Sequence, residues 1–266
     1  MLALPLMIIG AGALGGSILK GLRVTTTVDP SDVIILDLHP QAEAQAYGEL
    51  GARLNPEADV LAEARTVIVA VKPQGWRAVA EAFGDKLRAD AVIVSVMAGV
   101  RTTDLSAAFG ARKVARVMPT TGVATGKGVA SLYAAESEAL EAAKCIFEPI
   151  ASTVVLGDEG LIDAATAVSG SGPAYVYAFA AALEAAGLEA GLEADDARVL
   201  ARATLISAAN LLDISGEEPE ALIKKVASPG GTTEAGLKFL RAEGQGLNEL
   251  ITATVLAAQK RSRELG

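Results

Sequence analysis

Residues 6–16 read Leu6-Met7-Ile8-Ile9-Gly10-Ala11-Gly12-Ala13-Leu14-Gly15-Gly16, and this stretch indicates the fold most clearly. The apolar run predicts a buried strand, the glycines predict a tight turn, and the Ala-rich continuation predicts a helix. In such a unit the first glycine allows the turn, the second lets the backbone approach a pyrophosphate, and the third lets helix and strand pack closely. We therefore expect a dinucleotide to bind at Gly10, Ala11, Gly12, Ala13 and Leu14, with its phosphates on the helix N-terminus. The alternative is a plain glycine-rich βα turn.

An acidic residue ends the next predicted strand, Ile34-Ile35-Leu36-Asp37. Asp37 lies roughly 20 residues past the glycine turn, where a carboxylate hydrogen-bonds the adenosine ribose 2′-OH. The same charge would repel a 2′-phosphate, and nothing cationic stands beside it apart from His39. Of the two cofactors NADPH and NADH, the sequence favours NADH. The alternative is that Asp37 only caps the helix that follows.

Two later strands end in residues that we also assign to the cofactor site. Val71, Lys72 and Pro73 follow one strand, and Ala98 and Gly99 follow the next. Ligands bind at the carboxyl ends of parallel strands in such sheets. The rigid ring of Pro73 could pack against a nicotinamide, and Lys72 is a candidate catalytic residue or a support for the loop.

Two periodicities alternate along the first half of the chain. Short apolar runs separated by Ala-rich helical segments predict βαβ units, with a buried and mostly parallel sheet covered by helices on both faces. Past Gly157 the strand pattern stops and only helical segments remain. We predict an α/β fold with a Rossmann-type dinucleotide domain over residues 1–157 and an all-helical domain over residues 158–266. The predicted strands are Leu6–Gly10, Val33–Asp37, Thr66–Val71, Ala91–Val96, Lys113–Met118, Val129–Tyr133 and Thr153–Leu156.

The predicted helices Pro173–Ala186 and Ala194–Leu212 are apolar or small on most of their circumference. A helix that is hydrophobic all round is buried all round. So few helices cannot bury one another that fully within one chain. The sequence therefore predicts a homodimer formed through the helical domain.

Composition excludes several classes of function. The net charge is −9 and no basic block occurs, which argues against nucleic acid as a partner. The single cysteine, Cys145, cannot form an intrachain disulfide, and neither it nor the single His39 suggests a metal site or a catalytic triad. The apolar stretches at residues 1–9 and 174–186 fit neither a targeting segment nor a membrane span. We expect a cytoplasmic protein without metal.

Residues 226–237 read Val226-Ala227-Ser228-Pro229-Gly230-Gly231-Thr232-Thr233-Glu234-Ala235-Gly236-Leu237. Two glycines and two threonines that open a helix expose N–H donors and two hydroxyls at the positive end of the helix dipole. Such an opening can bind a carboxylate, even in a protein of negative net charge, because local donors outweigh the screened global field. The alternative is that Thr232 or Thr233 is merely an N-cap.

With these motifs in place, the chain resembles the pyrroline-5-carboxylate reductases. The run Ser228–Thr233, with Gly236-Leu237 and the terminal Arg261-Ser262-Arg263-Glu264-Leu265, resembles the C-terminal signature of that family. Ser169-Gly170-Ser171-Gly172-Pro173-Ala174-Tyr175 resembles its domain-junction motif, and Val71-Lys72-Pro73-Gln74 and the glycine loop match as well. The resemblance covers nearly the whole chain in order.

The resemblance implies NAD(P)H-dependent reduction of 1-pyrroline-5-carboxylate to L-proline, the last step of proline biosynthesis. It implies a homodimer with interleaved helices, which commonly assembles further to a decamer, and an active site formed by the cofactor domain of one subunit and the loop of the other. Ser228, Gly230, Gly231, Thr232 and Thr233 are then the substrate-binding residues, with Thr233 also near the imine nitrogen as the main catalytic candidate. A protonated imine is already electrophilic, so the reaction needs positioning more than a strong acid–base pair.

Two departures from the family pattern leave alternatives open. The family usually reads Met-Pro-Asn-Thr-Pro where this chain has Met118-Pro119-Thr120-Thr121-Gly122. Thr120 therefore replaces an amide and Gly122 loosens a turn, which favours as one alternative a related imine or ketone reductase acting on another small carboxylic acid. Asp37 departs from family members suited to NADPH. A non-catalytic dinucleotide-binding sensor is the other alternative, although it would not need the Ser228–Thr233 loop.

Overall fold

The computed structural model describes residues 2–265. Contacts between Cα atoms divide the chain into two compact units. The first runs up to Gly170 and takes in the chain again from Ala258 on, and the second spans Ser171–Ala257. The domain boundary that the sequence predicts at residue 157 marks the end of the strand pattern and stays a prediction.

The first unit is built on one eight-stranded sheet with the order β3-β2-β1-β4-β5-β6-β7-β8. All neighbouring strands are parallel except β6 and β7, which form an antiparallel pair. The expected mostly parallel sheet is therefore confirmed. The strands are β1 Leu6–Ile9, β2 Val33–Leu36, β3 Arg53–Leu54, β4 Thr66–Val69, β5 Val92–Ser95, β6 Val114–Pro119, β7 Gly128–Ala134 and β8 Ala151–Val155.

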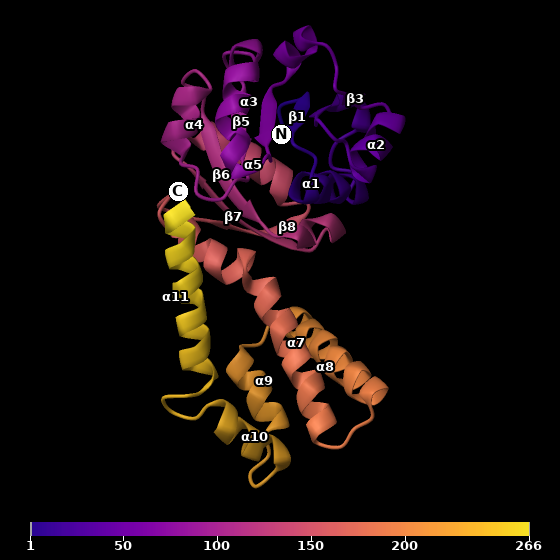
Figure 1. The fold of residues 1–266 in the computed structure, drawn as a ribbon, viewed down its shortest axis with the longest axis vertical. Coiled ribbons are helices and arrows are strands. Elements are labelled where there is room, and N and C mark those ends of the chain that lie inside the picture. The colour runs from indigo at the N-terminus through magenta and orange to yellow at the C-terminus, as the bar shows by residue number, and fades with distance from the viewer. Residues whose placement is uncertain (1, 266) are drawn as a thin grey trace. The chain divides into compact units, whose positions relative to one another are not determined.

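Helices cover both faces of this sheet (Figure 1). Alternate residues of each central strand enter two separate cores, because successive side chains of a strand point to opposite faces. The α-helices of the first unit are α1 Ala13–Val24, α2 Ala42–Glu49, α3 Trp76–Phe83, α4 Thr102–Ala108, α5 Ser137–Phe147 and α6 Leu161–Ala165. Short 3-10 turns are η1 Pro30–Asp32, η2 Ala58–Glu63, η3 Pro73–Gly75, η4 Gly84–Lys86 and η5 Thr121–Thr125, and a π-helical turn spans Thr166–Gly170.

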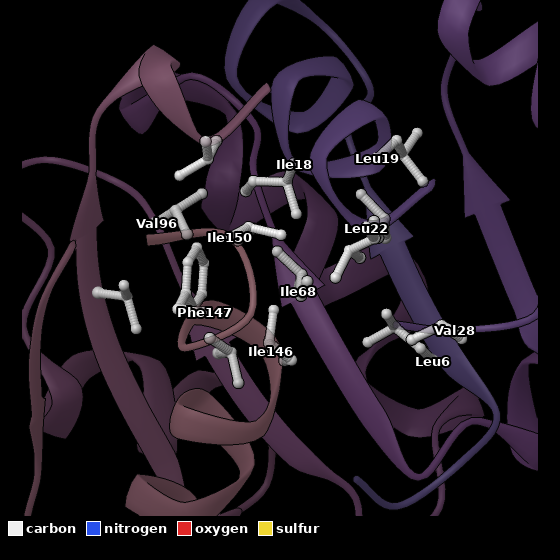
Figure 2. Packing of buried hydrophobic residues seen from close by; sticks show 14 of the residues in the cluster. Leu6, Ile18, Leu19, Leu22, Val28, Ile68, Val96, Ile146, Phe147 and Ile150 are labelled. Atoms are coloured by element: carbon white, nitrogen blue, oxygen red, sulfur yellow. The ribbon is translucent and has the colours of Figure 1, made fainter. Parts of the chain in front are cut away.

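One core lies between the sheet and helices α1, α2 and α5. Figure 2 shows Ile18 and Leu22 of α1 and Phe147 of α5 converging on Ile68 of β4, and all four side chains are fully buried. Burying a side chain of this size stabilises the fold by about 1.5–3 kcal/mol. This packing fixes the start of α1 against the ends of β1 and β4, where the glycine loop lies.

The opposite core, under α3 and α4, contains one buried ion pair. Arg116 of β6 lies 3.3 Å from Glu159, measured from Nη1 to Oε1, and its side chain is only 5% exposed. The Glu159 carboxylate also accepts the N–H of Thr102 at 2.8 Å and its hydroxyl at 2.9 Å, at the start of α4. The turn after β8 is thereby tied to the first turn of α4.

The second unit consists of helices alone. They are α7 Gly172–Glu189, α8 Ala194–Ser215, α9 Pro219–Val226, α10 Thr232–Leu240 and α11 Leu247–Leu265, the last of which ends in the first unit. α7 and α8 lie side by side (Figure 1). The expected helical half is confirmed.

Large apolar side chains of the second unit stay exposed in the single chain. Tyr177 of α7 is 71% exposed, and on α8 Ile206 is 62% and Ile214 is 80% exposed. Monomeric proteins rarely expose a contiguous apolar surface of this kind. The outward faces of α7 and α8 are therefore not covered by the described residues, 2–265, of their own chain.

Candidate functional site

The glycine loop between β1 and α1 has the geometry that its sequence predicts. Gly10 has φ +91°, and a Cβ there would lie 2.9 Å from the Ala70 carbonyl oxygen. A Cβ on Gly15 would lie 2.0 Å from the carbonyl oxygen of Gly10, so only glycine lets α1 start this close to β1. Gly12 is the N-cap of α1, and the position of its missing Cβ is open. The first turn of a helix leaves N–H groups unpaired, so the loop fits a dinucleotide pyrophosphate.

The Asp37 carboxylate lies directly beside this loop. Its Oδ2 accepts the N–H of Ala11 at 2.5 Å, and its Oδ1 accepts the N–H of His39 at 2.7 Å. The N-cap of α2 is Gln41, so Asp37 does not cap that helix. An ionised carboxylate offers about four acceptor sites, and two of them remain for ribose hydroxyls.

Further predicted cofactor residues follow β4, which is paired with β1, and β5, which is paired with β4. Because these strands are parallel, their carboxyl ends lie at the same edge as the glycine loop. Val71 contributes there to the packing around Gly10, at 2.9 Å from the ideal Cβ position. Lys72 is exposed and is the N-cap of the 3-10 turn that begins at Pro73. Ala98 and Gly99 are half-buried after β5.

The β6–β7 connection contains the residues at which the chain departs from the family pattern. Thr120 is buried, donates its N–H to the Val129 carbonyl at 2.9 Å and accepts the Val129 N–H on its hydroxyl at 3.1 Å. The loop then packs on α1, since a Cβ on Gly21 would lie 2.2 Å from the Val123 carbonyl oxygen. Thr120 therefore closes a hairpin that supports the cofactor helix.

The predicted substrate loop lies in the second unit and forms a tight turn before α10. Gly231 donates its N–H to the Ser228 carbonyl at 3.0 Å across Pro229 and Gly230, and Gly230 has φ +73°. A proline followed by a residue with positive φ is typical of a type II turn. Gly231 is the N-cap of α10, which begins at Thr232.

This geometry separates the donors of the loop into two groups. The N–H of Gly230 donates to Glu234 Oε2 at 2.8 Å, so an internal carboxylate already uses that donor. Thr232 and Thr233 are exposed, and both occupy the first turn of the helix rather than its N-cap. The interpretation of either threonine as the cap is therefore wrong, and their hydroxyls and N–H groups are the donors that face solvent.

Three side-chain contacts are not predicted from the sequence. Asn55, after the short β3, hydrogen-bonds the backbone of Asp37. Glu234 pins the turn at Gly230, and Glu159 pairs with Arg116. An Asn or Glu in a surface pattern has no periodicity, so only the three-dimensional contacts identify these residues.

The chain is similar in sequence to known proteins over nearly its whole length. A family model described as "Pyrroline-5-carboxylate reductase dimerisation" matches residues 159–265, and one described as "NADP oxidoreductase coenzyme F420-dependent" matches residues 5–99. A pyrroline-5-carboxylate reductase of Pseudomonas aeruginosa is 36% identical over 97% of this chain and 95% of its own length. The chain belongs to the pyrroline-5-carboxylate reductase family.

Other members of the pyrroline-5-carboxylate reductase family agree along the full length. The Synechocystis enzyme of that name is 35% identical over 100% of this chain and 99% of its own length. The solved structure of a pyrroline-5-carboxylate reductase from Coxiella burnetii superposes with a TM-score of 0.89 at 27% identity, covering 99% of this chain and 98% of that one. The resemblance drawn from the sequence motifs is confirmed.

Two features are absent from the described residues, 2–265. Among them, no three or more His, Cys, Asp or Glu side chains are grouped so that they could hold a metal ion. None of the helices described has the length and apolar character needed to span a membrane.

Proposed function

We propose that this chain reduces 1-pyrroline-5-carboxylate to L-proline with a nicotinamide dinucleotide. Family membership over the full length carries the proposal, because a 36% identical relative with this named activity aligns over 97% of the chain. Two sites support it independently. The glycine loop fits a dinucleotide, and the opening of α10 offers donors to a small carboxylate.

The reaction adds a hydride to the C=N carbon of the protonated cyclic imine, and the ring nitrogen keeps its proton and becomes the amine of proline. The dihydronicotinamide supplies the hydride when it is bound. The contribution of the protein is then binding, orientation and exclusion of water, and such positioning can lower a barrier by about 7–11 kcal/mol. This explains how a chain whose only histidine is His39, an exposed loop residue, can carry the activity.

The substrate carboxylate is proposed to bind at the N-terminus of α10. Its donors are the backbone N–H groups of Thr232 and Thr233 and the side-chain hydroxyls of Ser228 and the two threonines, while Gly231 uses its own N–H within the turn. These N–H groups lie at the positive end of the helix dipole, where an anion is stabilised by about 0.3–1 kcal/mol before any hydrogen bond is counted. Gly230 contributes through its left-handed conformation, which makes the turn.

Thr233 is proposed to act on the imine nitrogen, by a hydrogen bond or through a water. Thr233→Ala should lower kcat substantially and leave the Kd for the dinucleotide unchanged, because the glycine loop is not altered. Thr103→Ala is the matched control, since Thr103 is also an exposed threonine in the first turn of a helix. Unchanged turnover in Thr233→Ala would remove this residue from the mechanism.

Asp37 is proposed to give a preference for NADH over NADPH. Its carboxylate holds one N–H on each oxygen and has room for the two hydroxyls of the adenosine ribose. A 2′-phosphate at the same place would meet this negative charge. Dinucleotide oxidation at 340 nm with each cofactor tests the preference, and faster turnover with NADPH would refute it.

A homodimer through the helices of the second unit is the proposed assembly, with a decamer as a further step. The exposed apolar side chains of α7 and α8 support this, because a second copy would bury them. Light scattering of the purified protein tests both steps. A monomer at micromolar concentration would overturn the proposal.

A related imine or ketone reductase activity on another small acid is the second candidate. It is favoured by Thr120, whose hydroxyl is bonded to the Val129 N–H, where relatives usually have an amide. Turnover of cyclic imines of other ring sizes, compared with that of 1-pyrroline-5-carboxylate under the same conditions, separates the two candidates.

A further inference from the structure

Asn55 occupies the point at which the edge strand β3 stops. Its backbone lies in the left-handed region with φ +48°, and its N–H donates to the Ile35 carbonyl at 2.8 Å. Its side-chain amide pairs with the backbone of Asp37, the residue that follows β2. Oδ1 accepts the N–H of Asp37 at 2.9 Å, and Nδ2 donates to the carbonyl of Asp37 at 2.8 Å.

The side chain of Asn55 replaces a stretch of strand that β3 cannot provide. β3 pairs with β2 only through Arg53 and Leu54. The residue after Asn55 is Pro56, which has no N–H to donate to a ladder. A primary amide has the same donor and acceptor as a peptide group, so it can pair with both backbone groups of Asp37. Asn also tolerates the left-handed conformation better than most residues.

Asp37 is consequently held on both sides. Its backbone is held by Asn55, and its carboxylate is held by the N–H groups of Ala11 and His39. One strand residue earlier, Leu36 accepts the N–H of Gly10 at 2.8 Å. The carboxylate that reaches the glycine loop is thereby fixed relative to that loop before any dinucleotide arrives.

We propose that Asn55 is a positioning residue for dinucleotide recognition, which sets the discrimination between a ribose diol and a ribose 2′-phosphate by fixing Asp37. The proposal rests on the assignment of Asp37 to the adenosine ribose made above. Binding costs less when the recognising group is already ordered, so loss of the amide should weaken NADH binding selectively. NADPH binding does not profit from a fixed Asp37 and should change little.

Asn55→Gly isolates the amide, because glycine adopts positive φ at no steric cost. An alanine there would add backbone strain and confuse the result. Thr26→Gly is the matched control. Thr26 is also exposed with φ +52°, and its hydroxyl donates only to the neighbouring carbonyl of Thr25.

The test is calorimetric titration of the full-length protein with NADH and with NADPH, without substrate. The expected result is a Kd for NADH about tenfold higher in Asn55→Gly, a Kd for NADPH within about twofold of the original, and no change in Thr26→Gly. Amide hydrogen exchange at Asp37 in the dinucleotide-free protein should also become faster in Asn55→Gly. In the Asp37→Ala background, Asn55→Gly should have no further effect on NADH binding.

Two failures are distinguishable. If Asp37→Ala lowers the preference for NADH but Asn55→Gly leaves both Kd values unchanged, or raises them equally, Asn55 is not a positioning residue and the role of Asp37 stands. If Asp37→Ala itself leaves the ratio of the two Kd values unchanged, the ribose assignment is wrong and the proposal for Asn55 is overturned with it.

Discussion

The buried pair of Arg116 and Glu159 allows a prediction whose size follows from the geometry. In Glu159→Ala the guanidinium of Arg116 keeps its position, only 5% exposed, but loses its one carboxylate partner. Its Nε is already buried without a hydrogen-bond partner. The variant also removes the acceptor of the Thr102 N–H and hydroxyl. We expect a large loss of stability from a residue that contributes little apolar contact.

Removing one partner of a buried pair costs about 3–5 kcal/mol, because an uncompensated charge stays inside. Glu159 is 20% exposed, so water can partly solvate the gap, and the low end of about 3 kcal/mol applies. Arg116→Met should cost only about 1 kcal/mol, since Glu159 keeps its hydrogen bonds to Thr102 and reaches water. The double variant should therefore be more stable than Glu159→Ala alone.

Urea unfolding followed by the fluorescence of Trp76 measures these differences. Trp76 is the only tryptophan and is buried in the first unit, so it reports on the part that contains the pair. Glu138→Ala is the control, because Glu138 pairs with Lys113 on the surface and should cost below about 1 kcal/mol. The reasoning is refuted if Glu159→Ala is no less stable than Glu138→Ala, or if the double variant is the least stable of the four.

Three further outcomes follow from the structure. Gly12→Ala should leave the melting temperature of the dinucleotide-free protein unchanged, because the Cβ meets open space, yet raise the Kd for NADH at least about tenfold in a titration. Gly21→Ala should cost about 1–3 kcal/mol in urea unfolding, because its Cβ would lie 2.2 Å from a carbonyl oxygen. Burial raises the pKa of Tyr47 to about 12 from 10.0. Protonated Tyr47 therefore stabilises the folded protein fully below pH 10, and this stabilisation is lost as the pH rises to about 12. In Tyr47→Phe, the free energy of unfolding measured across this pH range should lose the part of its pH dependence that comes from Tyr47.

The strands and their alternation with helices could be predicted from the sequence, because the strands are continuous apolar runs. All seven predicted strands form and lie next to one another in the sheet, with β3 added at its edge. β3 was missed because two residues, Arg53 and Leu54, carry no detectable period. The helical segment after β4 forms α3, which ends at Phe83 because Gly84 begins a 3-10 turn.

The candidate site was predictable where function depends on backbone shape and less so where it depends on a side chain reaching another strand. Gly10 and Gly15 are identifiable because only glycine fits there. Asn55 is not, because its importance comes from where its amide points. The use of the Gly230 N–H by Glu234 is likewise a matter of side-chain direction, which residue spacing does not fix.

The chain leaves the first unit and later re-enters it, and this limits the conformational entropy of the segment in between. The second unit leaves the first at Ser171, and the chain re-enters the first unit at Ala258, where the Ser262 hydroxyl donates to Asp163 at 2.7 Å. If the helices melt while the sheet stays folded, the melted segment is a closed loop and cannot explore the conformations of a free tail. Closing a loop of this length costs about 4 kcal/mol of conformational free energy. The folded helices are stabilised by that amount relative to the same helices attached at one end, without any additional contact.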